Sequence, residues 1–138
     1  MKTDEKIALI NYRLDRSRES LKAAYLMFEN DLCVSAMNRI YYSMFYAVQA
    51  LLILKGSTFS KHGQVKGFFN REFIKKEIFP KEFGRLFNNA FEYRQKFDYV
   101  DLITPDSALI SDYLGKADTF IDELSRYIHG ESQSFLKL

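Results

Sequence analysis

Apolar residues recur at intervals of three and four along most of the chain, the spacing of one face of an α-helix. In the first segment these positions are Ile7, Ile10, Leu14, Leu21, Ala24, Tyr25 and Phe28. Thr3 or Asp4 is expected to cap this helix, which runs to about Glu29. A second helix is expected from Asp31, as its N-cap, to just before Gly56, a residue type suited to the position after a helix end.

Two shorter helices are expected next. The loop over residues 56–63 contains the polar residues Ser57, Thr58, Ser60 and His62. A third helix is expected over about 64–76, with Val65, Phe68, Phe69 and Phe73 facing inward. Pro80 favours the start of a fourth helix, because a proline at the first helical position gives up no hydrogen bond. The apolar stripe of that helix consists of Phe83, Leu86, Phe87, Ala90 and Phe91.

A fifth helix is expected to follow Thr104, as its N-cap, and to end at Gly130. Residues 131–138 would then form a flexible tail. The sequence contains no strand-like alternation, internal repeat or interdomain linker. Residues 1–130 are therefore expected to fold as one all-α bundle.

The composition agrees with a globular domain: 47% of the 138 residues are hydrophobic and 28% are charged, with thirteen Phe, nine Tyr and no Trp. Cys33 is the only cysteine, which excludes an intrachain disulfide and a cysteine-rich metal motif. The longest apolar stretch, around 41–54, is shorter than the roughly 20 residues needed to span a bilayer. The first ten residues lack the apolar core of a secretion signal. We therefore expect a soluble, cytoplasmic protein without membrane association.

Charge is distributed unevenly along the chain. Residues 55–96 contain ten Lys or Arg against four Glu, whereas residues 97–124 contain seven acidic residues against one Lys. This split fits either a nucleic-acid-binding face beside an acidic face, or two antiparallel helices that attract each other. We favour the second interpretation, because charged residues ordinarily occupy solvated helix faces.

Polar residues of the second helix form one stripe. They follow each other at spacings of four, three, four and three: Ser35, Arg39, Tyr42, Tyr46 and Gln49. Such spacing places them on one helix face. A buried polar group without a partner costs about 1–3 kcal/mol. These side chains are therefore expected either to pair with neighbouring helices or to line a binding site.

Arg94 lies on the same predicted face as the apolar residues Ala90 and Phe91, and Asp98 follows one helical turn later. Arg94 is expected either to form an ion pair with Asp98 or to bind a phosphate with its planar guanidinium. His62 is expected either to transfer protons or to bond a helix end. Neither His62 nor His129 has a metal-ligand partner at helical spacing, so no metal site is expected.

Three segments resemble the HEPN domain family of prokaryotes, in particular its small stand-alone branch. They are Asn38-Arg39-Ile40-Tyr41-Tyr42-Ser43-Met44-Phe45-Tyr46-Ala47, then Lys61-His62-Gly63 followed by Phe68 and Phe73, then Arg94-Gln95-Lys96-Phe97-Asp98-Tyr99. The resemblance covers nearly the whole chain. It implies an up-and-down bundle of four to five helices, a homodimer, and a minimal nucleotidyltransferase as partner in a toxin–antitoxin pair.

The resemblance also implies a chemistry. Many HEPN proteins are metal-independent ribonucleases with an arginine followed four to six residues later by a histidine. The ribose 2′-hydroxyl attacks the adjacent phosphate, while the histidine moves protons and the arginine stabilises the phosphorane. Arg94 matches this arginine, but Tyr99 occupies the place of the histidine. A tyrosine, with an ordinary pKa of about 10, is a poor general base near neutral pH.

Three alternatives follow: Tyr99 donates a proton or a hydrogen bond, His62 replaces the missing histidine, or the protein is not a nuclease. As a ribonuclease acting at a dimer cleft, the chain would use the catalytic residues Arg94, Tyr99, His62 and Asp98, with Asp98 orienting Arg94. RNA or nucleotide would be bound by Arg39, Tyr42, Tyr46 and Lys61. The alternative is a non-catalytic module that holds a nucleotide or the nucleotidyltransferase. No metal or cofactor is expected for either function.

Overall fold

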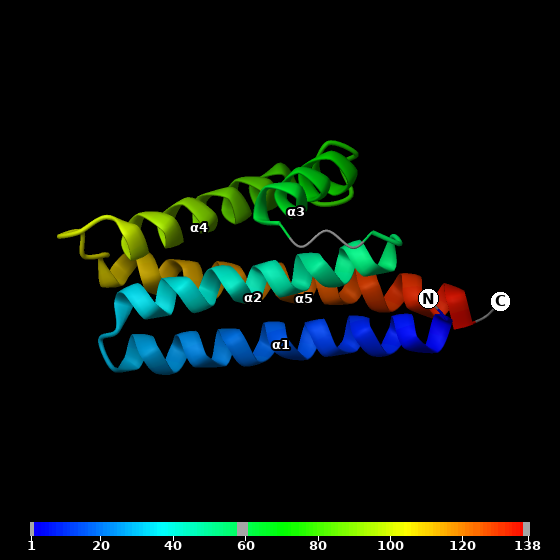
Figure 1. Ribbon diagram of the computed structural model, residues 1–138, viewed down its shortest axis with the longest axis horizontal. Coiled ribbons are helices and arrows are strands. Elements are labelled where there is room, and N and C mark those ends of the chain that lie inside the picture. The colour runs from blue at the N-terminus through cyan, green and yellow to red at the C-terminus, as the bar shows by residue number, and fades with distance from the viewer. Residues whose placement is uncertain (1, 58–60, 137–138) are drawn as a thin grey trace.

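Four long helices run alternately up and down along one axis (Figure 1). The computed structural model describes residues 2–57 and 61–136, with side chains as far as residue 131. The long helices are α1 (Thr3–Glu29), α2 (Cys33–Leu54), α4 (Lys81–Tyr99) and α5 (Ser107–Leu136). Between α2 and α4 lie the short helix α3 (His62–Phe69) and one turn of π-helix, η1 (Asn70–Ile74). No strand occurs in these ranges, and the expected all-α bundle is confirmed.

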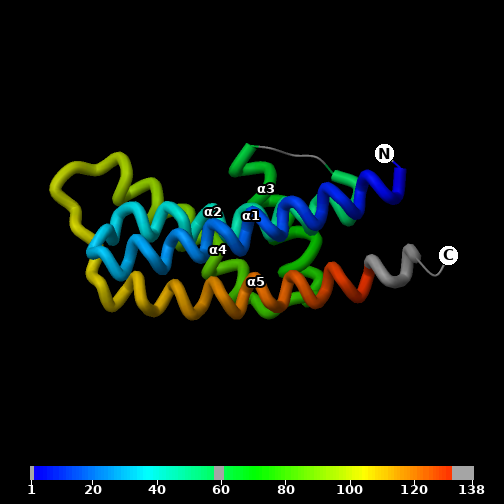
Figure 2. Tube along the Cα trace, turned by 90° about the horizontal axis from the view of Figure 1, so that it is seen from below, coloured from blue at the N-terminus to red at the C-terminus, as the bar shows by residue number. Residues whose placement is uncertain are grey.

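Helix α2 is the centre of the bundle, because it packs against α1, α3, α4 and α5. Most of its residues are buried. In Figure 1, α1 and α4 lie on opposite sides of α2, with α5 behind it. Figure 2 shows that the segment joining α4 to α5 extends past the α1–α2 turn at the same end of the bundle. Because α2 and α4 are in contact, the candidate residues on these two helices belong to neighbouring elements.

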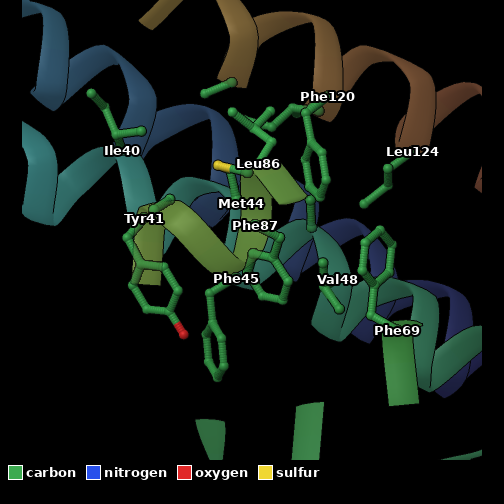
Figure 3. Close-up of a cluster of buried hydrophobic side chains, with 14 of the residues drawn as sticks. Ile40, Tyr41, Met44, Phe45, Val48, Phe69, Leu86, Phe87, Phe120 and Leu124 are labelled. Carbon is green, nitrogen blue, oxygen red and sulfur yellow. The ribbon is translucent and has the colours of Figure 1, made fainter. Parts of the chain in front are cut away.

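Aromatic rings form much of the core (Figure 3). The rings of Phe69, Phe87 and Phe120 meet with centroid distances of 5.6 to 6.1 Å. These three side chains are almost completely buried and come from α3, α4 and α5. Since a phenyl ring buries a large apolar area, this contact fixes the three helices against each other.

Gly56 ends α2 as expected. Its φ of 79° is in the left-handed region, which a residue without Cβ adopts at little cost. The N–H of Gly56 donates to Ile53 O at 3.0 Å, and the N–H of Ser57 donates to Leu52 O at 2.8 Å. These two bonds are those of a Schellman motif, and they satisfy carbonyls that the helix end leaves open.

The predicted N-caps are wrong. Thr3 and Asp4 are inside the first turn of α1, where a carboxylate still interacts favourably with the helix dipole. Asp31 has a φ of 60° and lies in the turn before α2. Pro80 precedes α4 instead of being its first residue. The cap expected at Thr104 is formed two residues later, where Asp106 Oδ1 accepts a bond of 3.0 Å from the N–H of Ala108.

Two further boundaries differ from the sequence prediction. Helix α5 continues through Gly130 to Leu136, so the expected end at Gly130 is wrong. A helical glycine costs only about 1 kcal/mol relative to alanine, which the packing of the preceding turns can offset. Helix α3 begins at His62, two residues earlier than predicted, and ends in η1. Thr58 and Ser60 of the predicted loop, and residues 137–138 of the predicted tail, lie outside the described residues.

The oppositely charged segments 55–96 and 97–124 are not joined by any ion pair among the described residues. Instead, Arg18 of α1 binds Asp118 of α5 at 2.7 Å and also contacts Asp122. The favoured explanation of the charge split, attraction between these segments, is thus not supported by ion pairs. In the part of the chain that the structure describes, every helix is too short or too polar to cross a membrane.

Candidate functional site

A buried tyrosine of α2 contacts the first residue of α3. Tyr41 is 1% exposed, and its hydroxyl oxygen lies 2.6 Å from Nδ1 of the half-buried His62. Figure 3 shows the Tyr41 ring beside Phe45, with the hydroxyl at the end of the ring. Burial raises the pKa of Tyr41, although the positive charge of Arg94 partly opposes this, so the hydroxyl stays protonated near neutral pH.

Arg94 of α4 packs on the same aromatic rings as His62. The guanidinium carbon lies 5.2 Å from the ring centre of Tyr41, 5.5 Å from that of Tyr42 and 5.7 Å from that of Phe91. The His62 ring lies 5.6, 5.9 and 5.9 Å from the same three ring centres. Burial, and then the charge of Arg94, lower the pKa of His62. The neutral imidazole is therefore favoured near neutral pH.

The guanidinium of Arg94 is not satisfied by the protein. Arg94 is 8% exposed, and its Nε is buried without a hydrogen-bond partner. The described residues provide it with no ion pair, so of the two alternatives for Arg94 the pair with Asp98 is not formed. Aromatic faces attract a cation but are only weak hydrogen-bond acceptors for an N–H group. This arginine is thus suited to bind an oxyanion.

Asp98 instead supports a different arginine. Its Oδ2 accepts a bond of 3.0 Å from Asn38 Nδ2, and Asn38 Oδ1 accepts bonds of 3.2 and 2.9 Å from Nε and Nη2 of Arg39. The Arg39 guanidinium carbon lies 5.0 Å from the ring centre of Tyr42. Asp98 therefore orients Arg39 through Asn38, and Arg39 and Arg94 share one tyrosine ring.

Tyr46, one turn after Tyr42, contacts α1. Arg16 Nη2 lies 3.5 Å from the Tyr46 hydroxyl, and the Arg16 guanidinium carbon lies 5.4 Å from the ring centre. The polar stripe of α2 thus has partners on both neighbouring helices. Ser35, at its beginning, is exposed, and Gln49, at its other end, has a buried Oε1 without a partner.

Other candidate residues are not brought together with Arg94. Tyr99, the last residue of α4, is 74% exposed. Five residues correspond to about 500° of helix rotation, so Tyr99 and Arg94 point to different sides of α4. Lys61 is exposed, and His129 is exposed on α5. The structure therefore brings His62, and not Tyr99, to Arg94.

A separate groove of about 650 Å³ lies between α4 and α5. None of the candidate site residues lines it; its apolar wall includes Phe83, Leu86 and Tyr113. Among the described residues there is no group of three or more His, Cys, Asp or Glu side chains placed to hold a metal ion.

By sequence alone, Tyr41 and Asn38 are marked only by the family resemblance, Phe91 is placed only on an apolar stripe, and Arg16 is given no role. Tyr41 and Asn38 do lie inside the ten-residue run that carried the resemblance, which is a signal for both. The contact of Tyr41 with His62 joins residues 21 apart in sequence. Helical periodicity cannot reveal such a contact, because it relates only residues of one helix.

The fold and the cluster define a small all-α bundle protein in which arginines and a histidine pack on shared aromatic rings. The family model of the HEPN domain matches residues 10–127, and the chain belongs to this family. A "UPF0332 protein" of Thermotoga maritima is 42% identical over 125 residues, which cover 91% of this chain and 95% of that protein. Two proteins of Methanocaldococcus jannaschii, "Putative toxin MJ0142" and "Putative toxin MJ0605", are 33% and 30% identical. These matches cover 83% and 82% of this chain, and 78% and 84% of those proteins.

Proposed function

We propose that this chain is the toxin of a toxin–antitoxin pair and cleaves RNA without a metal ion, with Arg94 and His62 as the reacting groups. The observation that supports this most is the packing of both side chains on the same three rings, Tyr41, Tyr42 and Phe91. His62 then does the work of the histidine that the motif lacks at Tyr99. The names of the two archaeal relatives support the toxin role.

The proposed reaction is an internal transfer at phosphorus. Nε2 of neutral His62 takes the proton of the ribose 2′-hydroxyl, whose oxygen bonds to phosphorus as the bond to the 5′-oxygen breaks. The imidazolium then returns the proton to the leaving 5′-oxygen, and a 2′,3′-cyclic phosphate remains. Arg94 stabilises the extra negative charge on the phosphoryl oxygens. Tyr41 can accept the Nδ1–H of His62 during this cycle, because a hydroxyl both donates and accepts.

The test is cleavage of a single-stranded RNA by the purified protein in excess EDTA. We expect cyclic-phosphate products, a loss of at least about 100-fold in rate for Arg94→Ala and His62→Ala, and little change for Tyr99→Phe. Arg126→Gln, which alters an exposed arginine of α5, is the matched control. Cleavage at an unchanged rate by Arg94→Ala would show that the activity belongs to another site or to a contaminant.

A second candidate is a non-catalytic module that binds a nucleotide or a nucleotidyltransferase. The unsatisfied Arg94 guanidinium beside Tyr42 favours it, because oxyanion binding needs no proton transfer. It predicts measurable nucleotide affinity without RNA turnover, lost in Arg39→Ala. Wild-type protein that binds neither a nucleotide nor a nucleotidyltransferase encoded beside it would exclude this module.

We also propose that the protein is a cytoplasmic homodimer that partners a minimal nucleotidyltransferase. Exposed apolar side chains at one end of the bundle support an interface there: Leu26, Leu32, Val100 and Leu102. Light scattering after size exclusion is expected to give twice the chain mass of 16.2 kDa. A mass of one chain at micromolar concentration would contradict the dimer, and failure of the co-expressed nucleotidyltransferase to co-purify would contradict the partner.

A further inference from the structure

A row of arginines on tyrosine rings continues from Arg94 across α2 to α1. Arg94 and Arg39 lie 5.5 and 5.0 Å from the ring centre of Tyr42. The rings of Tyr42 and Tyr46 are 6.0 Å apart, and Arg16 lies 5.4 Å from the Tyr46 ring centre. The row thus passes over three helices, since α2 lies between α4 and α1 (Figure 1).

The far end of this row is hollowed. A notch of about 140 Å³ between α1 and α2 is lined by Arg16 and Arg39, together with Tyr46, Ser20, Ala23 and Glu19. Glu19 is the single acidic side chain of the notch, and it forms no ion pair with either arginine. Two arginine side chains therefore line one small concave surface.

The arginines of the row differ from three other arginines of the molecule, although Arg13 and Arg85 likewise have no carboxylate partner among the described residues. Arg18, Arg71 and Arg126 each pair with a carboxylate within 4 Å. Within the described ranges, Arg16, Arg39 and Arg94 have no such carboxylate partner. Their charges are held by tyrosine rings and by the Asn38 amide, which leaves them available to an external anion.

Cations that alternate with aromatic rings match a single nucleic-acid strand, in which phosphates alternate with bases. The rings provide stacking surfaces and the arginines provide phosphate contacts, a combination typical of single-strand binding. A small anion would need only one of these arginines. The regular alternation from α4 to α1 indicates a polymer that crosses α2.

We propose that a single RNA strand leaves the Arg94–His62 site across α2, and that Arg39 and Arg16 bind phosphates along its path while Tyr42 and Tyr46 contact bases. This track rests on the proposed function, because it starts at the site where the strand is cut. Arg16 is its distal contact, and a short oligonucleotide bound at Arg94 does not reach it.

The test measures anisotropy of fluorescein-labelled oligouridylate with 2′-O-methyl sugars, which cannot be cleaved. A strand of about 12 nucleotides and a dinucleotide are titrated with wild type, Arg16→Gln and Arg126→Gln. For Arg16→Gln we expect roughly fivefold weaker binding of the long strand, and a fall of about 0.7 in the slope of log affinity against log salt. Binding of the dinucleotide, and both affinities of Arg126→Gln, are expected to remain unchanged.

Three results would overturn the track. The first is an unchanged affinity of Arg16→Gln for the long strand. The second is a loss of dinucleotide affinity in Arg16→Gln as large as its loss for the long strand. The third is binding of a duplex of the same length as tightly as the single strand. If the proposed function fails while the track is correct, the pattern is different. Arg16→Gln then binds the long strand more weakly than wild type does, but the wild-type protein does not cut unmodified RNA. Cleavage that proceeds while Arg16 has no influence on binding would reject the track and retain the nuclease.

Discussion

A guanidinium beside an imidazole makes it harder for the imidazole to accept a proton. Burial, followed by Arg94, lowers the pKa of His62 below its ordinary 6.5, whereas the unfolded chain keeps the ordinary value. Between these two values the unfolded chain binds more protons, so His62 adds stability that is lost as the pH falls through its folded pKa. Since the neutral form is the base, cleavage is also expected to rise with pH through that value.

The first prediction concerns this coupling. Arg94→Gln is expected to raise the pKa of His62 but to leave it below 6.5, because burial is the larger cause of the shift. NMR titration of the imidazole in a His129→Ala background gives the value directly, because the chain has only two histidines. A His62 pKa that is the same in wild type and in Arg94→Gln would contradict the electrostatic interaction between these two side chains.

The second prediction concerns the Tyr41 hydroxyl. Tyr41→Phe keeps the buried ring but leaves His62 Nδ1 without its bond, and is expected to cost about 1 kcal/mol of unfolding free energy. Tyr12→Phe, at an exposed position of α1, is the control and is expected to change stability by less than about 0.5 kcal/mol. Urea denaturation compares the two. Equal stability of both variants would show that the Tyr41–His62 bond contributes nothing.

At the scale of elements, α4 approaches η1 closely at Gly84. A Cβ at this position would lie 2.7 Å from Asn70 Oδ1 and 3.3 Å from two side-chain carbons of Ile74. Asn70 cannot move aside freely, because its amide nitrogen donates to Lys66 O at 3.0 Å and to Asn88 Oδ1 at 3.3 Å. The π-helical turn and the glycine together allow the two helices to pack.

The third prediction follows from that contact. Gly84→Ala is expected to destabilise the fold by about 1–3 kcal/mol through overpacking. Gly115→Ala, in the interior of α5 with nothing within 4 Å of the new Cβ, is expected to stabilise it by up to about 1 kcal/mol. Both free energies come from denaturant unfolding followed by far-UV circular dichroism. Stabilisation by both substitutions would mean that helix propensity, and not the contact with η1, decides the outcome at Gly84.

Helix ends were the least predictable elements. Gly56 could be predicted, because a left-handed residue after a helix favours glycine independently of the remaining fold. Asp31, Thr104 and Gly130 were wrongly assigned, since each has the right residue type near a boundary that other contacts determine. Most positions of the apolar faces were right, because burial follows the spacing of large side chains along each helix, but Tyr25 of the first helix is exposed.

At the scale of the whole molecule, apolar contacts between helices outweigh ion pairs. Helix α5 is held by Phe120 in the aromatic core and by the exposed pairs of Arg18 with Asp118 and Asp122. The Arg18 side chain is 41% exposed, so water and salt screen its charge. The bundle should therefore tolerate the loss of Arg18 much better than the loss of Phe120.

The fourth prediction compares these two changes. Phe120→Ala is expected to cost about 3–5 kcal/mol, because it leaves a cavity where α3, α4 and α5 meet. Arg18→Ala is expected to cost less than about 1 kcal/mol. Guanidinium chloride midpoints measure both. A larger loss for Arg18→Ala would show that the ion pairs with α5 hold the bundle together.

The candidate site could be predicted only in part. Arg94, Arg39 and Tyr42 were found because they lie in motifs and on predicted helix faces. One of the two alternatives for Arg94, a pair with Asp98, is not formed. Spacing by one helical turn permits that contact, but Asp98 instead accepts a hydrogen bond from Asn38, 60 residues away in sequence. Which of Tyr99 and His62 lies beside Arg94 depends on how α3 packs on α2, and helical periodicity does not reveal that packing, because it relates only residues of one helix.

The concentration of tyrosines around Arg94 has an optical consequence. The chain has nine Tyr and no Trp, so its near-ultraviolet emission comes from tyrosine alone. Tyr41, Tyr42 and Tyr46 all lie at the proposed site or along the track. A base that stacks on the partly exposed ring of Tyr42 or Tyr46 would quench part of the emission, so the unlabelled protein can report on its own ligand.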